Sequence, residues 1–393
     1  MGDINFTSLA PLDASRLELN LITSPKNVPP PDSPDVLAIK AATDHMILAQ
    51  WSAQGGWEAP KVVPYGPIPL LPSASALQYA TQCFEGMKVF RGHDGQLRLF
   101  RPDYNCERFF NSATRIALPG FDKSELLKLI RKICALEAPK WLPKDQTGSA
   151  LYIRPTFIGS DSSLGFKVPE EALLCIFLTY WPAQKPLTAN DGPAACRLLA
   201  SNESVVRAFP GGTGAAKIGA NYGPSLLEHA EAKSKGYDQV LWLFGPDRQI
   251  TEAGSTNVFV IWRTLSGSLQ IVTPPLDGDK LILAGGTRRS LIELAREMFK
   301  VGKEGAESCE VLEERITLPE VEKAAQEGRL EGVFVVGTAF QIQSVRQIGF
   351  NGKDVDIAVE KTCHVSMLRE RLANIVYGNE DSTWTQIVDE EAI

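Results

Sequence analysis

The sequence predicts a two-domain protein of mixed α+β and α/β class. The chain has 393 residues, and at roughly 150 residues per domain two or three domains are expected. Short β-type segments alternate with helical stretches on both sides of residues 182–193, a segment with three prolines and no apolar periodicity that is typical of a linker. We therefore predict an N-terminal arm and a small α+β domain over 1–181, an interdomain linker over 182–193 and a larger domain over 194–393.

The first predicted domain begins with a Pro-rich arm over 1–36 and continues as a run of β-type segments to residue 117. Within this run, two apolar stretches flank His93-Asp94-Gly95, a pattern typical of a hairpin. Residues 124–137 change to helical spacing, with Ser124 as the expected N-cap. Two apolar segments, ALYIRPTFI and ALLCIFLTYW, have the length of strands and complete this domain.

The second predicted domain opens with a strand over 195–200 and a glycine-rich loop around Lys217. A helix follows from Pro224 to a stop at Gly236, because proline favours the first helical turn and glycine favours the residue after the last one. The remaining predicted elements are a hairpin over 238–251, amphipathic helices over 287–299 and 318–330, and a buried strand over 331–339 that runs into a turn.

Charge and cysteine content exclude several classes of partner. The formal net charge is −7 and no run of five like charges occurs, so neither nucleic acid nor a membrane surface is an expected partner. No stretch approaches the roughly 20 apolar residues that span a bilayer. The seven cysteines include no pair at two-residue spacing and the four histidines are never four residues apart, so no metal site is expected. The acidic N-terminal residues are untypical of a targeting leader, and we expect a cytoplasmic protein.

The loop FPGGTGAAKIGANYGP places five glycines around Lys217. It does not match a phosphate-binding P-loop, because Ala216 and Ile218 stand where that motif has glycine and serine or threonine. Small and apolar neighbours desolvate an amine and lower its pKa toward the range in which a lysine forms a Schiff base. From the residues alone, Lys217 is either such a reactive lysine or a solvated loop lysine.

The segment LAGGTRRSLIELA predicts an anion-binding helix N-terminus. Gly285, Gly286 and Thr287 directly precede an amphipathic helix, so their amides face outward at its positive end. Three other residues have no local pattern that points to a site. From the residues alone, Glu252 fits a surface acid, Arg101 fits an exposed arginine at the end of a hairpin, and Tyr222 fits an aromatic residue of the core.

Six strings carry a resemblance to a known family: YGPIPLLPSASALQYATQCFEGMKVFRG, LRLFRPDYN, LYIRPTFIG, KIGANYGPSL, ITEAGSTNVFV and VVGTAFQ. In this order and spacing the sequence resembles the branched-chain amino acid aminotransferases over about residues 45–375. These are pyridoxal 5′-phosphate enzymes of fold type IV, so the resemblance implies a small α+β domain and a larger β-barrel-like domain with helices. It also implies transamination of leucine, isoleucine and valine with 2-oxoglutarate, which gives branched 2-oxo acids and L-glutamate.

The resemblance assigns cofactor roles to individual residues. Lys217 matches the Schiff-base lysine, and Glu252 matches the carboxylate that keeps the pyridine nitrogen protonated. Arg101 matches the phosphate-binding arginine, and Tyr222 matches the tyrosine that binds the phenolic oxygen. Further cofactor contacts are expected from Ser255, Thr256, Asn257, Gly286, Thr287 and Thr338. The sequence departs from the family at Ala284 and Gly286, where proline and a branched residue are usual, and at Ser255, where threonine is common.

The resemblance also implies a pocket for two kinds of substrate. The aromatic wall around the branched side chain is matched by Tyr79, Phe84 and Tyr152. Arg154 matches the residue that meets the distal carboxylate of glutamate or 2-oxoglutarate. The turn at Thr338 and Ala339 offers backbone amides to the substrate α-carboxylate. Members of the family are homodimers, so a homodimer is expected.

Three alternatives stay open. One is another fold type IV enzyme, such as a D-amino acid or (R)-amine transaminase or an aminodeoxychorismate lyase-like enzyme. A second is a specialised biosynthetic paralogue that uses an unusual amino donor. A third is a cofactor-binding or scaffold protein without catalysis, which the joint presence of Lys217, Glu252 and Arg101 disfavours.

Overall fold

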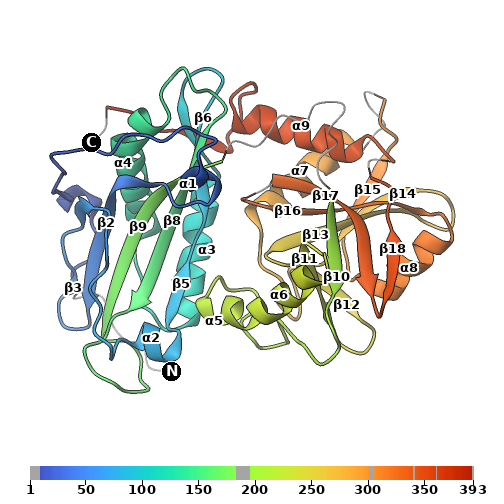
Figure 1. The fold of residues 1–393 in the computed structure, drawn as a ribbon, viewed down its shortest axis with the longest axis horizontal. Coiled ribbons are helices and arrows are strands. Elements are labelled where there is room, and N and C mark those ends of the chain that lie inside the picture. Colours follow the sequence, from blue (N-terminus) through green and yellow to red (C-terminus); the bar gives the residue numbers. More distant parts are fainter. Residues whose placement is uncertain (1–8, 183–194, 301–304, 340, 360, 392–393) are drawn as a thin grey trace. The chain divides into compact units, whose positions relative to one another are not determined.

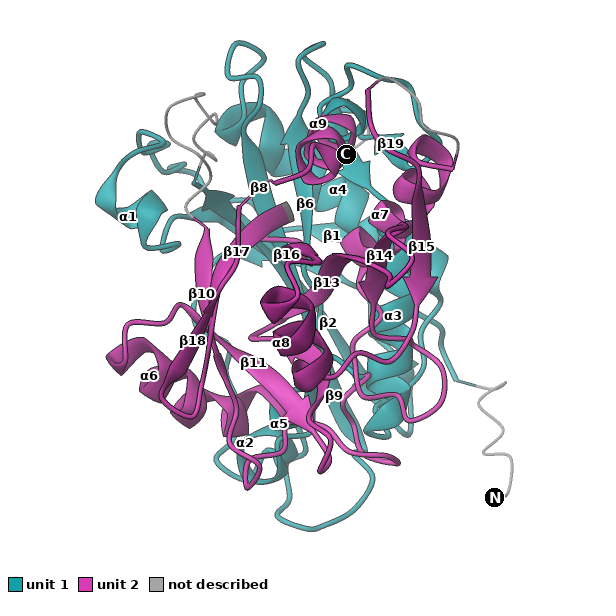
Figure 2. Cartoon of the chain, turned by 90° about the vertical axis from the view of Figure 1, so that its right-hand side faces the viewer, with its two compact units in different colours: residues 1–183, 216–220, 374–393 teal, residues 184–215, 221–373 magenta. Residues whose placement is uncertain are grey.

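The computed structural model describes residues 9–182, 195–300, 305–339, 341–359 and 361–391. Contacts within the chain define two compact units (Figure 2). Unit 1 comprises Met1–Ala183, Ala216–Ala220 and Asn374–Ile393, and unit 2 comprises Gln184–Ala215 and Asn221–Ala373. Apart from Pro182, the predicted linker at 182–193 lies outside the described residues. The predicted domain boundaries therefore stay a prediction.

Unit 1 is built on one large sheet (Figure 1). Among the described residues the strand order is β1-β4-β2-β9-β8-β6-β7-β19, with β3 attached to β2 and β5 attached to β8. The strands are β1 (Glu18–Leu19), β2 (Ala42–Ser52), β3 (Gly56–Trp57), β4 (Lys61–Pro64), β5 (Gln82–Phe84), β6 (Met87–Arg91), β7 (Leu97–Phe100), β8 (Ala150–Gly159), β9 (Glu171–Trp181) and β19 (Thr385–Ile387). The long β8 and β9 confirm the two strands predicted from their apolar segments.

Two stretches of the predicted larger domain, 194–393, belong to unit 1 in the structure. Residues 216–220 reach β5 through a bridge between Ile218 and Cys83. Residues 374–393 are anchored where β19 pairs antiparallel with β7. Pairing between distant parts of a chain is not visible in sequence order, and here it places Lys217 in unit 1.

Helix α3 (Pro102–Arg115) corrects the prediction of β-type segments up to residue 117. Pro102 occupies the first helical turn, where a missing amide costs nothing. Cys106 and Phe109 follow at helical spacing and are buried. The prediction was wrong here because the preceding hairpin signal was extended into a segment that has its own helical period.

Helix α4 (Lys123–Trp141) confirms the helix predicted over 124–137. Its N-cap is Asp122 and not the predicted Ser124. The Asp122 side chain accepts hydrogen bonds from the amides of Ser124 and Glu125. A carboxylate that serves two open amides also complements the positive end of the helix.

The two faces of the unit 1 sheet differ in chemistry. Val89 and Leu151 are fully buried in the apolar core that the sheet shares with α3 and α4. Successive residues of a strand point to opposite faces. Lys88, Tyr152 and Arg154 therefore lie on the other face, which carries cations and aromatic rings.

Unit 2 contains a second sheet, which closes into a barrel. Among the described residues the order is β12-β11-β10-β17-β16-β13-β14-β15, β18 pairs with β17, and the pairing of β12 with β13 closes the ring. The strands are β10 (Cys196–Ala200), β11 (Gln239–Phe244), β12 (Gln249–Ala253), β13 (Thr256–Arg263), β14 (Leu269–Thr273), β15 (Cys309–Glu313), β16 (Leu330–Gly337), β17 (Gln341–Phe350) and β18 (Lys353–Asp356). Apolar side chains such as Val258, Val335 and Val345 form the buried core of this unit.

The helices after residue 216 are short to medium in length. They are α5 (Gly219–Tyr222), α6 (Leu226–Ser234), α7 (Gly286–Met298), α8 (Leu318–Gln326) and α9 (His364–Val376). The elements predicted for this part of the chain are confirmed by β10, α6, the β11–β12 hairpin, α7, α8 and β16, with small shifts at their ends. Among the described residues, no helix is long and apolar enough to cross a membrane. The described residues also contain no group of three or more His, Cys, Asp or Glu side chains that could hold a metal ion.

Candidate active site

Main-chain hydrogen bonds fix Lys217 on unit 1. Its N–H donates to the Ser112 hydroxyl of α3 at 2.9 Å, and its carbonyl accepts from the N–H of Phe84 on β5 at 3.1 Å. Ser112 is buried, and its own hydroxyl donates to the carbonyl of Arg108. One helix and one strand thus hold Lys217, which limits the positions that its amine can take.

The Lys217 amine is surrounded by protein atoms, although the residue keeps part of its surface accessible. The nitrogen lies 4.9 Å from the centroid of the Phe84 ring. Burial lowers the pKa of Lys217, Glu85 opposes this shift, and the guanidiniums of Arg108 and Arg154 add to it. Because the net direction is downward, more of this amine is neutral near pH 7 than in a solvated lysine. This environment favours the reactive-lysine interpretation over the solvated one.

Next to Lys217 lies a buried ion pair, Glu85–Arg108, which was not predicted from the sequence. The Glu85 oxygens accept from Arg108 Nε at 2.8 Å and from Nη2 at 2.5 Å. The same carboxylate accepts from the amide of Gly86 at 2.7 Å and from the Asn105 side chain at 3.3 Å. Burial would raise the pKa of Glu85, but Arg108, Lys217 and the Gly86 amide together lower it. Glu85 is therefore an ionised carboxylate whose charge acts on the Lys217 amine.

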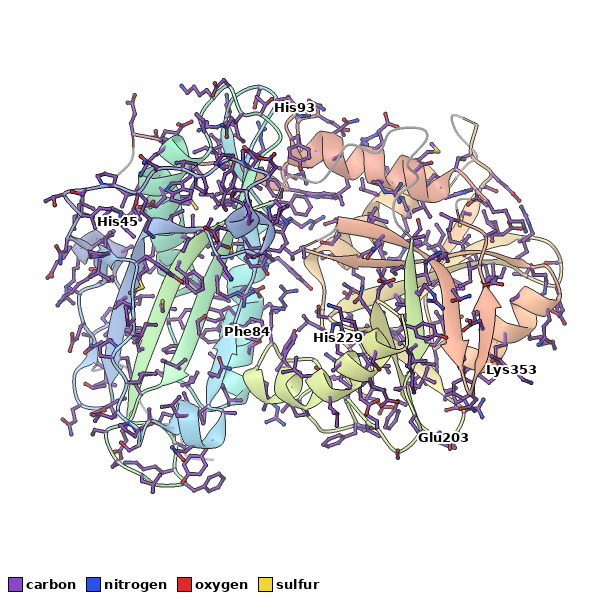
Figure 3. All side chains as sticks on the ribbon, viewed as in Figure 1. His45, Phe84, His93, Glu203, His229 and Lys353 are labelled. Carbon is purple, nitrogen blue, oxygen red and sulfur yellow. The ribbon has the colours of Figure 1, made fainter. Side chains whose placement is uncertain are left out.

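Phe84, Tyr152 and Arg154 lie together in unit 1; Phe84 is labelled in Figure 3. The Arg154 guanidinium is 4.9 Å from the Phe84 ring centroid and 5.2 Å from that of Tyr152. Gly86 makes room for Tyr152, because a Cβ there would lie 1.9 Å from the phenol oxygen. Arg154 Nε is buried and has no hydrogen-bond partner among the described residues, so it is a donor that an anionic ligand would satisfy.

Tyr79 is less clearly placed in this cluster. It ends the short helix α2 (Ser75–Tyr79) and is 40% exposed. Its ring makes an edge-on contact with Phe166 at 5.6 Å. Its membership of an aromatic wall stays a prediction.

Arg101 lies at the start of α3 and is held by the C-terminal segment. Its N–H donates to the carbonyl of Trp384 at 2.7 Å, and its guanidinium carbon is 3.9 Å from the centroid of that indole. The side chain is half-buried, which argues against an exposed hairpin-end arginine. The sequence analysis missed Trp384, because no local pattern connects the two residues.

Unit 2 also buries a carboxylate against an arginine. Glu252 on β12 is 2% exposed, and its Oε2 lies 2.7 Å from Arg207 Nη2. Its Oε1 accepts from the amide of Leu283 at 2.7 Å and from the Asn257 side chain at 3.4 Å. The surface-acid interpretation of Glu252 is therefore wrong. Arg207 is a site residue that the sequence analysis missed, since it belongs to none of the recognised strings.

The N-terminus of α7 lies against this carboxylate network. The N-cap Gly285 packs so closely that a Cβ would lie 2.1 Å from Asn257 Oδ1. Asn257 also donates to the carbonyl of Leu283 at 3.0 Å. Gly286 and Thr287 begin the helix, and no side chain of the described residues caps it. Open amides at a helix N-terminus are suited to binding an anion, and this role of Gly286 and Thr287 stays a prediction.

The end of β16 meets the start of β13 at one edge of the barrel. A Cβ on Gly337 would lie 3.1 Å from Thr256 Cγ2, so β16 ends close to Thr256, and Thr338 and Ala339 are the next residues in the chain. The Thr256 hydroxyl donates to the carbonyl of Ala253 at 2.6 Å. This hydrogen bond fixes the turn between β12 and β13.

A cavity of about 530 Å³ in unit 2 brings Tyr222 and Ser255 together. Arg207, the ion-pair partner of Glu252, lines the same cavity with Asn221 and other side chains. Tyr222 is half-buried, so it is not a core aromatic. Arg207 thus links the cavity that holds Tyr222 and Ser255 to Glu252, and Asn257 links Glu252 to the N-cap of α7.

Comparison with known proteins gives consistent findings. Residues 82–348 match the family model described as Amino-transferase class IV. The chain is 40% identical over 377 residues to a mitochondrial branched-chain-amino-acid aminotransferase of Rattus norvegicus, which covers 94% of this chain and 91% of the relative. It is 41% identical over 371 residues to the cytosolic branched-chain-amino-acid aminotransferase of Mus musculus, which covers 93% of this chain and 92% of the relative.

Solved structures share the fold at lower sequence identity. The branched-chain amino acid aminotransferase from Escherichia coli matches with a TM-score of 0.66 and 23% identity over 88% of this chain and 99% of that one. The branched-chain aminotransferase from the thermophilic archaeon Thermoproteus uzoniensis, solved with norvaline, matches with a TM-score of 0.64 and 24% identity over 87% of this chain and 100% of that one. This likeness confirms the predicted fold class.

Proposed function

Since this chain belongs to the class IV aminotransferase family, we propose that it is a pyridoxal 5′-phosphate-dependent branched-chain amino acid aminotransferase. It transfers the amino group of leucine, isoleucine or valine to 2-oxoglutarate, and the products are branched 2-oxo acids and L-glutamate. The relatives with this activity in their names span more than nine-tenths of the chain. The structural observation that carries the proposal is the buried Lys217 amine, whose pKa is lowered and which lies beside Phe84.

Each unit taken by itself has groups of the kind that this cofactor needs. Unit 1 has an amine with a lowered pKa, and unit 2 has a buried carboxylate and a helix N-terminus whose first residues are Gly286 and Thr287. When bound, pyridoxal phosphate supplies a carbonyl carbon and a protonated ring that withdraws electrons from the substrate. Lys217 would hold that carbon, Glu252 would bind the ring nitrogen, and Gly286 and Thr287 would bind the phosphate. The proposed contacts are completed by Arg101, Tyr222, Ser255, Thr256, Asn257 and Thr338.

Lys217 is also the proposed proton carrier. Its lowered pKa lets the neutral amine accept the proton from the substrate α-carbon, and the resulting ammonium returns it. Glu85 stabilises that ammonium, so its charge partly offsets the effect of burial. The hydrogen bond to Ser112 keeps the lysine main chain in place while the amine moves.

Substrate recognition is proposed to divide between apolar and charged groups. Phe84 and Tyr152 pack against the branched side chain. Arg154 meets the distal carboxylate of glutamate or 2-oxoglutarate, and its buried Nε is suited to that charge. The amides at Thr338 and Ala339 bind the α-carboxylate.

Turnover by two lysine variants tests the proposal. The wild-type protein with pyridoxal phosphate, L-leucine and 2-oxoglutarate is expected to form L-glutamate, and Lys217→Ala is expected to form none. The matched control Lys144→Ala, at an exposed loop position of unit 1, should keep wild-type activity. Glutamate formation by Lys217→Ala would contradict the assignment of the lysine. Faster turnover of D-alanine than of L-leucine would favour another fold type IV enzyme.

A homodimer is part of the proposal. Unit 1 exposes the apolar side chains of Leu164, Phe166 and Val168 to 69%, 91% and 60%. A cluster of this kind on a folded surface is typical of an association site. Light scattering is expected to give the mass of a dimer, and a fully active monomer would contradict it.

A cytoplasmic location is also proposed. The relatives include both cytosolic and mitochondrial enzymes. The cysteines are free, and six of them, including Cys83 and Cys134, are buried, as is common in a reducing compartment. Microscopy of a fluorescent fusion would show diffuse signal, and a mitochondrial pattern would contradict the proposal.

A further inference from the structure

A continuous row of cations and aromatic rings runs along one face of the unit 1 sheet to the Lys217 amine. Each step is a contact of about the same length. The successive separations are 4.7 Å from Lys88 to Trp181, 4.8 Å from Trp181 to Tyr152, 5.2 Å from Tyr152 to Arg154, 4.9 Å from Arg154 to Phe84 and 4.9 Å from Phe84 to Lys217. Cations attract aromatic faces, so the order of the row is electrostatically favourable.

Lys88 and Trp181 are the members of this row to which the proposed reaction gives no role. Lys88 lies on β6, in register with Tyr152 on β8, and is 4% exposed. Burial lowers its pKa to about 7, so the folded protein disfavours the cation that a lysine would otherwise be. At this buried position the lysine lies over the Trp181 ring, a cation–π contact that an apolar side chain could not make.

The Tyr152 ring is held from three sides. Trp181 stacks on it with an interplanar angle of 29°. The Arg154 guanidinium also contacts the ring, and Arg154 Nη2 is 3.4 Å from the phenol oxygen. Gly86 packs against the phenol oxygen, which a Cβ at this position would approach to 1.9 Å. The orientation of Tyr152 is thus tied to Trp181, and the orientation of Arg154 is tied to Tyr152.

We propose that Lys88 and Trp181 are positioning residues that fix Tyr152 and, through it, aim Arg154 at the distal carboxylate of the dicarboxylic substrate. This inference rests on the proposed function, because it assigns the dicarboxylate to Arg154. Lys88 contacts the Trp181 ring, and that ring in turn stacks on Tyr152. Loss of this support weakens binding of 2-oxoglutarate more than binding of a branched 2-oxo acid, which has no second carboxylate.

The test compares binding of two 2-oxo acids to the pyridoxal phosphate-loaded protein. Calorimetry measures the dissociation constants of 2-oxoglutarate and 4-methyl-2-oxopentanoate, and steady-state kinetics gives the corresponding KM values. For Lys88→Met, the ratio of the 2-oxoglutarate constant to the branched-acid constant is expected to rise about three- to tenfold. Lys88→Arg keeps the charge and should stay near the wild-type ratio. Lys144→Met removes an exposed lysine and should change nothing.

Thermal unfolding separates positioning from a structural role. Lys88→Met is expected to keep the wild-type Tm within about 3 °C, because methionine has a similar volume and fills the same buried position. A purely structural Lys88 would give a lower Tm and equal losses for both acids, and that result would overturn the inference. An unchanged ratio would also overturn it. If Lys88→Met does not fold, the ratio in Trp181→Phe decides, with a rise supporting the inference and no change refuting it. A wild-type protein that binds both acids without transferring an amino group would contradict the proposed function and leave the binding comparison intact.

Discussion

In each unit a buried glutamate near the proposed site residues pairs with an arginine, and the two pairs are built differently. In unit 1, Arg108 donates to both oxygens of Glu85 through two nitrogens. In unit 2, Arg207 contacts one oxygen of Glu252, and the amide of Leu283 donates to the other. The first pair sets a fixed charge that acts on the Lys217 amine. The second presents a carboxylate among the residues proposed to bind the cofactor. A buried carboxylate can therefore act at a distance on the pKa of a neighbouring group, as proposed for Glu85, or contact a ligand directly, as proposed for Glu252.

The largest expected effect is on stability, from loss of the unit 1 carboxylate. Glu85→Ala removes the charge that compensates the buried Arg108 guanidinium, which costs about 3–5 kcal/mol of unfolding free energy. Chemical denaturation measures this loss. The double variant Glu85→Ala with Arg108→Met should recover much of it, and the exposed control Glu58→Ala should lose nothing. A single variant as stable as wild type would show that the pair is not a structural unit.

The next effect is on turnover, from the unit 2 carboxylate. Glu252→Gln keeps the shape and a hydrogen-bond acceptor but removes the charge, so kcat/KM for L-leucine should fall at least about a hundredfold. The stability loss should be smaller than for Glu85→Ala, because Gln still accepts from Leu283. Glu370→Gln, exposed on α9, is the matched control. Wild-type turnover by Glu252→Gln would remove Glu252 from the proposed site.

A smaller loss of turnover is expected at Arg207. Arg207→Met removes one charge-assisted hydrogen bond to Glu252, which corresponds to about a tenfold fall in kcat/KM. Arg207→Lys should recover part of it, since a lysine keeps the charge without the fork geometry. Arg315→Met, at an exposed ion pair with Asp247, is the control. Equal losses of kcat/KM in Arg207→Met and in the control would show that the contact between Arg207 and Glu252 does not contribute to turnover.

The smallest expected effect is a shift in pH dependence. Glu85 raises the pKa of Lys217 against burial, so Glu85→Gln should lower that pKa further. A lower pKa keeps the amine neutral at more acidic pH, and the acidic limb of the kcat/KM profile for L-leucine should move to lower pH. A shift to higher pH would contradict the assigned role of the Glu85 charge.

Site candidates could be found from the sequence where one short stretch contains the pattern that points to them. Lys217 stands in a glycine-rich loop, and Gly286 and Thr287 stand before an amphipathic helix, so a contiguous string identifies each of them as a candidate. Strands β8, β9, β10 and β16 and the β11–β12 hairpin were predictable for the same reason, because apolar period and length belong to each segment by itself. The other barrel strands were not predicted.

The residues that were missed are partners in long-range contacts. Arg108 lies on α3, which was taken for β structure, so its pairing with Glu85 was invisible. Arg207 meets Glu252, and Trp384 meets Arg101, only after distant parts of the chain have come together. Nothing in the local sequence around these partner residues distinguishes them from other arginines and tryptophans. Their role depends on contacts that only the tertiary structure shows.

Transfer of labelled nitrogen tests the central claim most directly. The holoenzyme is incubated with ¹⁵N-labelled L-leucine and 2-oxoglutarate, and mass spectrometry follows the label. The account predicts ¹⁵N-labelled L-glutamate and 4-methyl-2-oxopentanoate in equal amounts, with no transfer by Lys217→Ala. Label that stays on leucine with the intact wild-type protein, or that moves equally well without Lys217, would contradict it.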